Sequence, residues 1–260
     1  MIAKMKKIEA LSEDYKRRTS VETIAYKKAG SWEKVRQDWW YALIFYFDRA
    51  FYQGRSDSLS GNFERATVTA LDEVLGGVSS HEKLSSLKRL SHWVQPDQWK
   101  TQENPLWVAL NEKYQIDGKE VGTGRERDKE MVLDSLRFVL NDCKDCNILE
   151  HSTHQIENQN MAPLSKRLDD ITSVGVKITS FFLRDTVFFY DLEACVRAED
   201  YPYLMTIDRW VSKVTNKLGI KANAETIATT CLQNGISPVR FAIGLWYVGS
   251  HSFDVLLDML

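Results

Sequence analysis

The sequence lacks the features that define several classes of protein. Its 260 residues include only five prolines and four cysteines. No apolar run approaches the roughly 18 residues that a membrane-spanning helix needs, so we expect no membrane segment. Residues 1–7 lack the apolar core of a signal peptide, which predicts a cytoplasmic protein. In that reducing compartment the four cysteines are expected to be free thiols.

The chain also lacks the basic excess that is typical of nucleic-acid-binding proteins, because its formal charge is -2. The charge is unevenly distributed, however. Residues 1–36 contain ten Lys and Arg against five Asp and Glu. This basic N-terminal arm is a candidate DNA contact, although a solvated helical face gives the same pattern.

Apolar residues recur at helical spacing along most of the chain. Residues 114–121 surround an Asp-Gly pair, which predicts a small β-hairpin. Residues 122–127 are glycine-rich but lack the Gly-Lys-Ser/Thr ending of a phosphate-binding P-loop. We expect a mobile surface loop there, with DNA contact as the alternative. The apolar spacing predicts helices over 35–53, 62–75, 80–92, 128–141, 224–233 and 237–247.

Residues 168–208 place one lysine and one aspartate at two helix starts. A short turn at Ser173-Val174-Gly175 precedes Lys177, and Gly175 suits a sharp turn or a close approach. After Lys177 the apolar spacing predicts a helix of roughly 20 residues, about 30 Å long. A second helical run begins directly after Asp208, which stands at the expected N-cap.

The same stretch carries a resemblance to a known family. Ile171-Thr172-Ser173-Val174-Gly175-Val176-Lys177, followed by Thr206-Ile207-Asp208, resembles the helix-hairpin-helix (HhH-GPD) DNA glycosylases. In that family the hairpin reads roughly L-P-G-V-G-x-K and a motif like P-V-D follows. Ser173 stands at the first glycine, and Thr172 and Thr206 stand at the two prolines. The separation of Lys177 from Asp208, 208 minus 177 or 31 residues, looks most like the archaeal 8-oxoguanine DNA glycosylase branch.

The resemblance implies that Lys177 is a nucleophile and that Asp208 assists it. A free lysine is almost fully protonated at neutral pH, so a nucleophilic lysine needs surroundings that favour the neutral amine. A helix start and burial among Phe181 and Phe182 would provide them. Asp208 would accept a proton and stabilise positive charge on the sugar. The alternatives are a solvated lysine and an aspartate that only caps a helix.

DNA binding follows from the same resemblance. The backbone of Ser173, Val174, Gly175 and Val176 would hold a DNA phosphate at the helix start. Trp246 would stack on a base flipped out of the duplex, or would belong to the core.

A second cluster contains possible zinc ligands. Cys143, Cys146, His151 and His154 lie within twelve residues, and zinc requires four such ligands. Their spacing resembles a zinc knuckle only loosely, and residues 141–160 look like an exposed connection. We therefore expect free thiols and surface histidines, no metal and no cofactor, with zinc binding left open. The closely spaced four-cysteine set of iron–sulfur relatives is missing, so no cluster is expected.

Together these patterns predict an all-α protein with two helical lobes, a helix-hairpin-helix motif and an active site in the cleft. Residues 1–130 would form a helical lobe with the basic arm, and residues 131–260 the catalytic lobe. The expected function is a DNA glycosylase, with AP lyase activity, acting as a monomer on double-stranded DNA. Its expected substrate is an 8-oxoguanine-like purine or a hypermodified base, for instance a glycosylated one. The alternatives are a non-catalytic helix-hairpin-helix DNA-binding protein and a helical protein-interaction factor.

Overall fold

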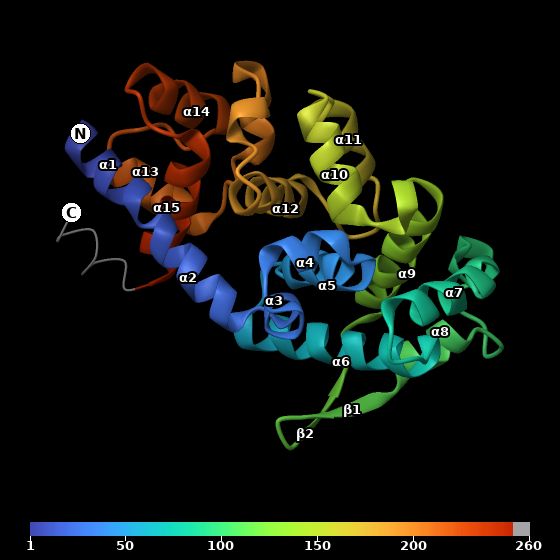
Figure 1. Cartoon of the computed structure of the whole chain (residues 1–260). Helices are drawn as coiled ribbons and strands as arrows, with labels where there is room; N and C mark the ends of the chain where they lie inside the picture. Colours follow the sequence, from blue (N-terminus) through green and yellow to red (C-terminus); the bar gives the residue numbers. More distant parts are fainter. Residues whose placement is uncertain (252–260) are drawn as a thin grey trace. The chain divides into compact units, whose positions relative to one another are not determined.

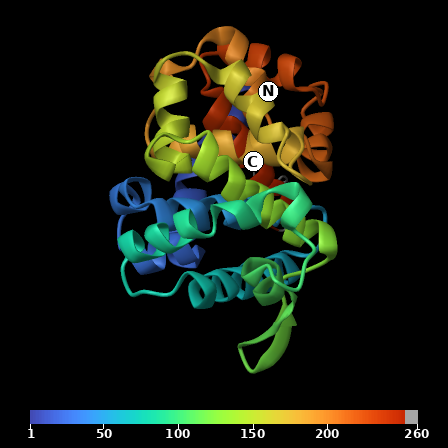
Figure 2. The same ribbon diagram turned by 90° about the vertical axis from the view of Figure 1, so that its right-hand side faces the viewer.

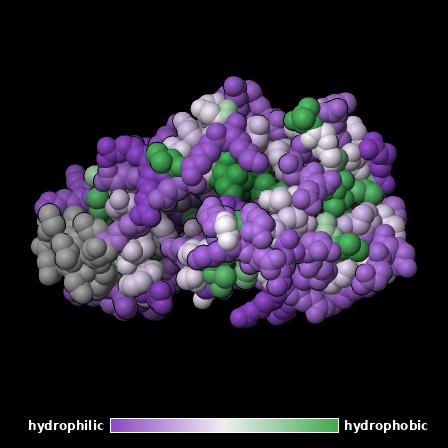
Figure 3. All heavy atoms as spheres, turned by 90° about the horizontal axis from the view of Figure 1, so that it is seen from below, coloured by the Kyte–Doolittle hydropathy of each residue, from purple (hydrophilic) through white to green (hydrophobic). Residues whose placement is uncertain are grey.

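The computed structural model describes residues 1–251 and is mostly helical (Figure 1). The only strands within these residues are β1 (Lys113–Ile116) and β2 (Lys119–Gly122). The all-α prediction is confirmed. The face drawn in Figure 3 is largely hydrophilic, with hydrophobic side chains in small separate patches. None of the described helices is long and apolar enough to cross a membrane.

The chain divides into two compact units, and both are discontinuous in sequence. Unit 1 comprises residues 1–23, 152–166 and 176–260, and unit 2 comprises residues 24–151 and 167–175. Residue 130, the predicted boundary between the two lobes, lies inside α9 (Glu126–Asn141) of unit 2. Continuous apolar spacing does not reveal such a boundary, since helices of both units share the same period.

Unit 2 is built around the apolar helix α5 (Trp39–Ala50), in which ten of the twelve residues are buried. The predicted helix over 35–53 is interrupted at Asp38, whose Oδ1 accepts the N–H groups of Trp40 at 2.9 Å and Tyr41 at 3.4 Å. A capping aspartate starts a new helix even where the apolar period continues. The other helices of unit 2 are α3 (Ile24–Ala29), α4 (Trp32–Gln37), α6 (Asp57–Leu75), α7 (Ser80–Arg89), η1 (Ser91–Val94), η2 (Pro96–Gln98), α8 (Pro105–Asn111), α9 and η3 (Lys144–Cys146).

Turn chemistry explains several boundaries in unit 2. Helix α6 ends at Gly76, which has a φ of 61°, as the Gly-Gly pair suggests. The predicted hairpin is confirmed, because β1 and β2 pair antiparallel across Asp117 and Gly118, both with positive φ. It projects from the helices of unit 2 (Figure 2). Residues 122–127, where a mobile surface loop was expected, lead into α9; Arg125, Glu126 and Arg127 are exposed, whereas Thr123 is fully buried and its hydroxyl donates to the carbonyl of Leu110.

Unit 1 is arranged around α15 (Pro238–Ser250), against which α1 (Ile2–Ala10), α2 (Ser12–Glu22), α12 (Val176–Phe189), α13 (Arg209–Lys217) and α14 (Ala224–Gln233) pack. Two glycines allow these contacts. A Cβ on Gly244 would overlap the carbonyl of Ile8, and a Cβ on Gly249 would overlap Trp210. The basic N-terminal segment is therefore held on α15 through buried residues such as Ile8. Helices α10 (Ile148–Glu157) and α11 (Met161–Asp169) both cross the division between the units.

Helix α12 is shorter than predicted, with 14 residues instead of roughly 20. Asp191, at a φ of 53°, turns the chain away from the helix. Two short 3-10 helices follow, η4 (Glu193–Cys195) and η5 (Ala198–Leu204). The apolar pattern continued past residue 189 because Leu192, Tyr201 and Leu204 of this segment are also buried.

Candidate functional site

Lys177 and Asp208 both belong to unit 1 and begin neighbouring elements. Lys177 is the second residue of α12, and Asp208 is the N-cap of α13, as the sequence predicts. The side chain of Asp208 accepts the N–H groups of Trp210 and Val211, each at 2.8 Å. Both bonds use Oδ1, and no hydrogen bond to Oδ2 occurs within residues 1–251. The cap therefore fixes the carboxylate and leaves its second oxygen available.

A pair of hydroxyl groups joins the two helix starts. Ser180, one turn after Lys177, lies 3.0 Å from the carbonyl oxygen of Lys177 through its Oγ. The same Oγ is hydrogen-bonded to Oγ1 of Thr206 at 3.3 Å. Thr206 is buried and precedes Asp208 by two residues. The structure thus holds the backbone that carries Lys177 beside the backbone that leads into Asp208.

The turn before Lys177 has a left-handed residue at the position where the family hairpin has a glycine. Ser173 has a φ of 62°, and the N–H of Val174 donates to the carbonyl of Ile171 at 2.9 Å. The sharp turn expected at Gly175 is therefore made at Ser173. Gly175 has no positive φ, and a Cβ there would meet nothing within 4 Å.

This geometry also corrects the expected phosphate contact. The N–H of Val174 is used inside the turn and the Val174 side chain is buried, so Val174 is not available to a phosphate. Gly175 and Val176 are exposed, and the relative accessibility of residue Val176 is 73%. Gly175 and Val176 form the exposed end of the turn, and the DNA contact of residues 173–176 stays a prediction.

Asp134 supports the turn from α9 and was not identified from the sequence. Its Oδ2 accepts the N–H of Thr172 at 2.8 Å and the Thr172 hydroxyl at 3.0 Å. Its Oδ1 pairs with Arg137 at 2.5 Å. Because Asp134 and Thr172 are 38 residues apart, no local pattern could have linked them. Asp134 fixes the left-handed turn through which the chain enters α12.

The surroundings of Lys177 differ from those expected. Phe181 and Phe182 are buried, but the Lys177 side chain is exposed. The burial of the lysine among phenylalanines is therefore wrong. Lys177 lies at the very start of α12, where Val176 and Lys177 are exposed, whereas every residue from Ile178 to Phe189 is buried.

Trp246 on α15 belongs to an aromatic cluster beside the first turns of α12. Its ring lies 5.8 Å from the ring of Tyr15, edge-on, and 6.4 Å from the ring of Phe181. Phe181 follows Lys177 by four residues and so points along a neighbouring direction of the helix. Trp246 is half-buried. It therefore packs against Tyr15 and Phe181 while keeping some accessible surface.

A buried ion pair lies beneath this aromatic cluster. Asp185 is fully buried, and its Oδ1 accepts from Nη2 of Arg184 at 2.8 Å. The other carboxylate oxygen accepts the hydroxyl of Tyr15 at 2.6 Å. The Arg184 guanidinium carbon lies 4.8 Å from the centre of the Phe181 ring. A buried pair of this kind is tolerated only where hydrogen bonds satisfy both partners, and it fixes α2 to α12.

The possible zinc ligands do not form a cluster. Cys143 and Cys146 are buried, and burial raises the pKa of the Cys143 thiol above its ordinary value. His154 is exposed on α10. This helix occupies residues 148–157 of the segment 141–160, which was expected to be an exposed connection. In the part of the chain that the structure describes, no three His, Cys, Asp or Glu side chains meet as metal ligands would.

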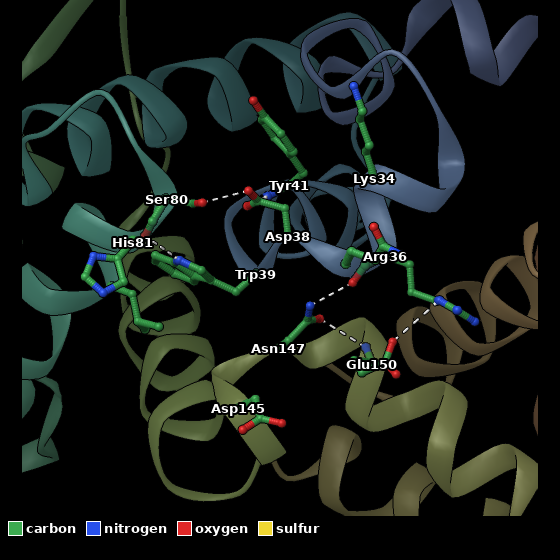
Figure 4. Close-up of a pocket in the computed structure, with 12 residues that line it drawn as sticks. Lys34, Arg36, Asp38, Trp39, Tyr41, Ser80, His81, Asp145, Asn147 and Glu150 are labelled. Atoms are coloured by element: carbon green, nitrogen blue, oxygen red, sulfur yellow. Dashed lines mark hydrogen bonds and ion pairs between the residues drawn. The ribbon is translucent and has the colours of Figure 1, made fainter.

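A separate polar pocket of about 690 Å³ lies within unit 2 (Figure 4). The first turns of α5, α7 and α10 line it. Its polar groups pair with one another, since Ser80 donates to Asp38 at 2.7 Å and Arg36 approaches Glu150 at 3.5 Å. Asn147 links two walls by donating to the carbonyl of Arg36 at 2.7 Å. These residues belong to unit 2, whereas Lys177 and Asp208 belong to unit 1.

Comparisons with protein-family models, with curated proteins and with solved structures find no match to this chain. The geometry of unit 1 therefore has to indicate what the chain can do. An exposed primary amine and a capped carboxylate with one available oxygen stand at two helix starts joined through Ser180 and Thr206. Such a pair can attack an electrophilic carbon and accept the proton that the amine releases.

Proposed function

We propose that this chain is a DNA glycosylase in which Lys177 is the nucleophile and Asp208 its carboxylate partner. The observation that carries the proposal is the hydroxyl link from Lys177 through Ser180 to Thr206, two residues before Asp208. It connects two sequence motifs that lie 31 residues apart (208 minus 177). The left-handed Ser173 also supports the proposal, because it stands where the family hairpin has a glycine, and glycine readily adopts that conformation.

The proposed reaction begins with attack of the neutral Lys177 amine on C1′ of a flipped nucleotide. The bond from C1′ to the base nitrogen breaks, and its electron pair leaves with the base, which takes up a proton. The attached amine gives a proton to Oδ2 of Asp208. Opening of the sugar ring then places a C1′=N iminium on Lys177, and O4′ takes the proton. Loss of a C2′ proton next expels the 3′ phosphate with the C3′–O electron pair, which is the AP lyase step.

Asp208 contributes charge as well as proton transfer in this scheme. Positive charge develops on the sugar as the base leaves, and a fixed carboxylate stabilises it. Because Oδ1 is held by two backbone N–H groups, the carboxylate needs little reorganisation during the reaction. The cap and the chemistry therefore use different oxygens of one side chain.

The proposed substrate is an 8-oxoguanine-like purine or a hypermodified base in double-stranded DNA. The half-buried ring of Trp246, beside Tyr15 and Phe181, offers an aromatic face on which such a base can stack. A panel of duplexes with oxidised, alkylated, deaminated and glycosylated bases, followed by mass spectrometry of the released base, identifies the substrate.

Borohydride trapping tests the nucleophile. Incubation with a duplex containing an abasic site should give a covalent protein–DNA adduct after hydride reduction of the iminium. Lys177→Gln should abolish the adduct, whereas Lys166→Gln should leave it unchanged, because Lys166 is an exposed lysine on α11 of the same unit. Undiminished trapping by Lys177→Gln would refute the assignment.

The exposure of Lys177 also favours a second candidate, a non-catalytic helix-hairpin-helix DNA-binding protein. An exposed lysine at a helix start can contact a DNA phosphate, and that contact needs no nucleophile. This candidate predicts DNA binding without an adduct and without release of any base in the panel.

A further inference from the structure

We propose that the exposed basic side of α13 binds consecutive phosphates of the DNA strand that contains the target nucleotide. This basic stripe consists of Arg209, Lys213 and Lys217. The inference rests on the proposed function, because it names the DNA-holding surface next to the Lys177 and Asp208 pair. It adds a partner surface that the hairpin resemblance does not include.

The three cations share one side of α13. They are spaced four residues apart, so they fall within an arc of about 80° on a helix of 3.6 residues per turn. All three are exposed. The opposite side of the helix is buried through Val211, Val214 and Thr215. The basic stripe therefore faces outward because the apolar side of the same helix is fixed against the core of unit 1.

Trp210 organises the first half of the stripe. The Arg209 guanidinium carbon and the Lys213 ammonium nitrogen each lie 4.7 Å from the centre of the Trp210 ring. The backbone of Trp210 is in close contact with α15, because Gly249 has no side chain there. Cation–π contacts of this kind limit the motion of long side chains. Two of the three charges are thus held beside a rigid ring.

Charge and length fit a DNA backbone. Residues 209–224 contain Arg209, Lys213, Lys217 and Lys221 but no Asp or Glu. From Arg209 to Lys217 the helix rises about 12 Å, at 1.5 Å per residue. One DNA strand advances about 3.4 Å along the helix axis per phosphate, so the stripe spans three to four nucleotides.

The position of the stripe relates it to the proposed chemistry. Arg209 directly follows Asp208, so a phosphate bound at Arg209 would adjoin the nucleotide that reacts. A base-flipping enzyme must hold the flanking backbone while the nucleotide rotates out of the stack. A regular row of cations beside the carboxylate is suited to that task, and such contacts position DNA without reading its sequence.

The salt dependence of DNA binding tests the stripe. The probe is a duplex with a tetrahydrofuran abasic-site analogue, which supports no base release or Schiff base, and fluorescence anisotropy measures the association constant over about 50–200 mM KCl. Each phosphate contact contributes about 0.9 to the slope of log association constant against log salt. The triple variant R209Q/K213Q/K217Q should lower the magnitude of that slope by about 2.7. Over this fourfold salt range wild type would then lose about 40-fold more affinity than the variant.

Two control proteins separate the stripe from total charge and from folding. The variant K88Q/R89Q/K113Q makes the same change in net charge at exposed positions of unit 2 and should keep the wild-type slope. The variant K213R/K217R retains the charges and should also keep the slope. The inference is overturned if wild type and the stripe variant have equal slopes, or if the unit 2 variant lowers the slope as much as the stripe variant does. It is also overturned if wild type does not bind the duplex.

The outcome is distinguishable from failure of the proposed function. A lower slope in the stripe variant together with no borohydride adduct in wild type would retain the DNA surface and reject the glycosylase. An adduct with unchanged slopes would retain the chemistry and reject the stripe.

Discussion

Asp208 serves two roles that two substitutions can separate. Its Oδ1 accepts two backbone N–H groups at 2.8 Å, while Oδ2 is the proposed proton acceptor. Asp208→Asn keeps an oxygen in the capping position and replaces the other oxygen with an amide. Asp208→Ala removes both. Asparagine caps helices about as well as aspartate, whereas alanine at this position costs about 1 kcal/mol, within a range of roughly 0.5–2.

Thermal unfolding and base release provide the two measurements. A loss of about 1 kcal/mol lowers the melting temperature by roughly 2–4 °C in a chain of this size, so Asp208→Ala should melt lower by that amount. Asp208→Asn should lose little more than the helix-dipole contribution, about 0.3 kcal/mol. Both variants should lose at least about 100-fold in the single-turnover rate of base release.

The comparison is informative in both directions. A wild-type rate in Asp208→Asn would refute the carboxylate's role in the reaction, since the amide accepts no proton and carries no charge. A melting temperature for Asp208→Asn as low as that of Asp208→Ala would refute the cap, because the retained oxygen would then be contributing nothing.

Two further predictions concern stability. Ser173→Gly should stabilise the protein by about 1 kcal/mol, because Ser173 adopts a φ of 62° that costs a non-glycine residue roughly 1–2 kcal/mol. Chemical denaturation measures the change in the free energy of unfolding. A destabilised variant would contradict the left-handed turn. Burial, followed by the charge of Asp48, raises the pKa of the Glu64 carboxyl well above its ordinary 4.5. The folded protein then retains a proton that the unfolded chain releases, so wild-type stability should fall as pH rises above about 4.5. Glu64→Gln removes that dependence. The melting temperature of the variant minus that of wild type should therefore increase from pH 5 to pH 8. A difference that stays constant over this range would show that the pKa of Glu64 is not raised.

The sequence predicted those parts of the fold that depend on neighbouring residues. The turn between β1 and β2 follows from Asp117-Gly118, and the range predicted for α14 matches the observed helix. Helix ends were missed where the apolar period continued across a break. At Asp38 a side chain caps the next helix, and at Asp191 the backbone turns left-handed, yet the apolar residues on either side remain in register. Local periodicity reports which side of the chain is buried, and it does not report where the backbone hydrogen bonds change partners.

The same distinction applies to the candidate site. Asp208 at a helix start was predictable because capping is local, and that prediction is confirmed. The contact that joins the two helix starts is not local, because Ser180 meets Thr206 from 26 residues away. The turn before Lys177 likewise depends on Asp134, which meets Thr172 from 38 residues away. Each involves an ordinary hydroxyl or carboxyl group that carries no motif. A pair of reactive residues can be inferred from spacing, but the groups that orient them become identifiable only when distant segments are seen together. The proposed chemistry therefore depends as much on Ser180 and Thr206 as on the two residues that the sequence identified.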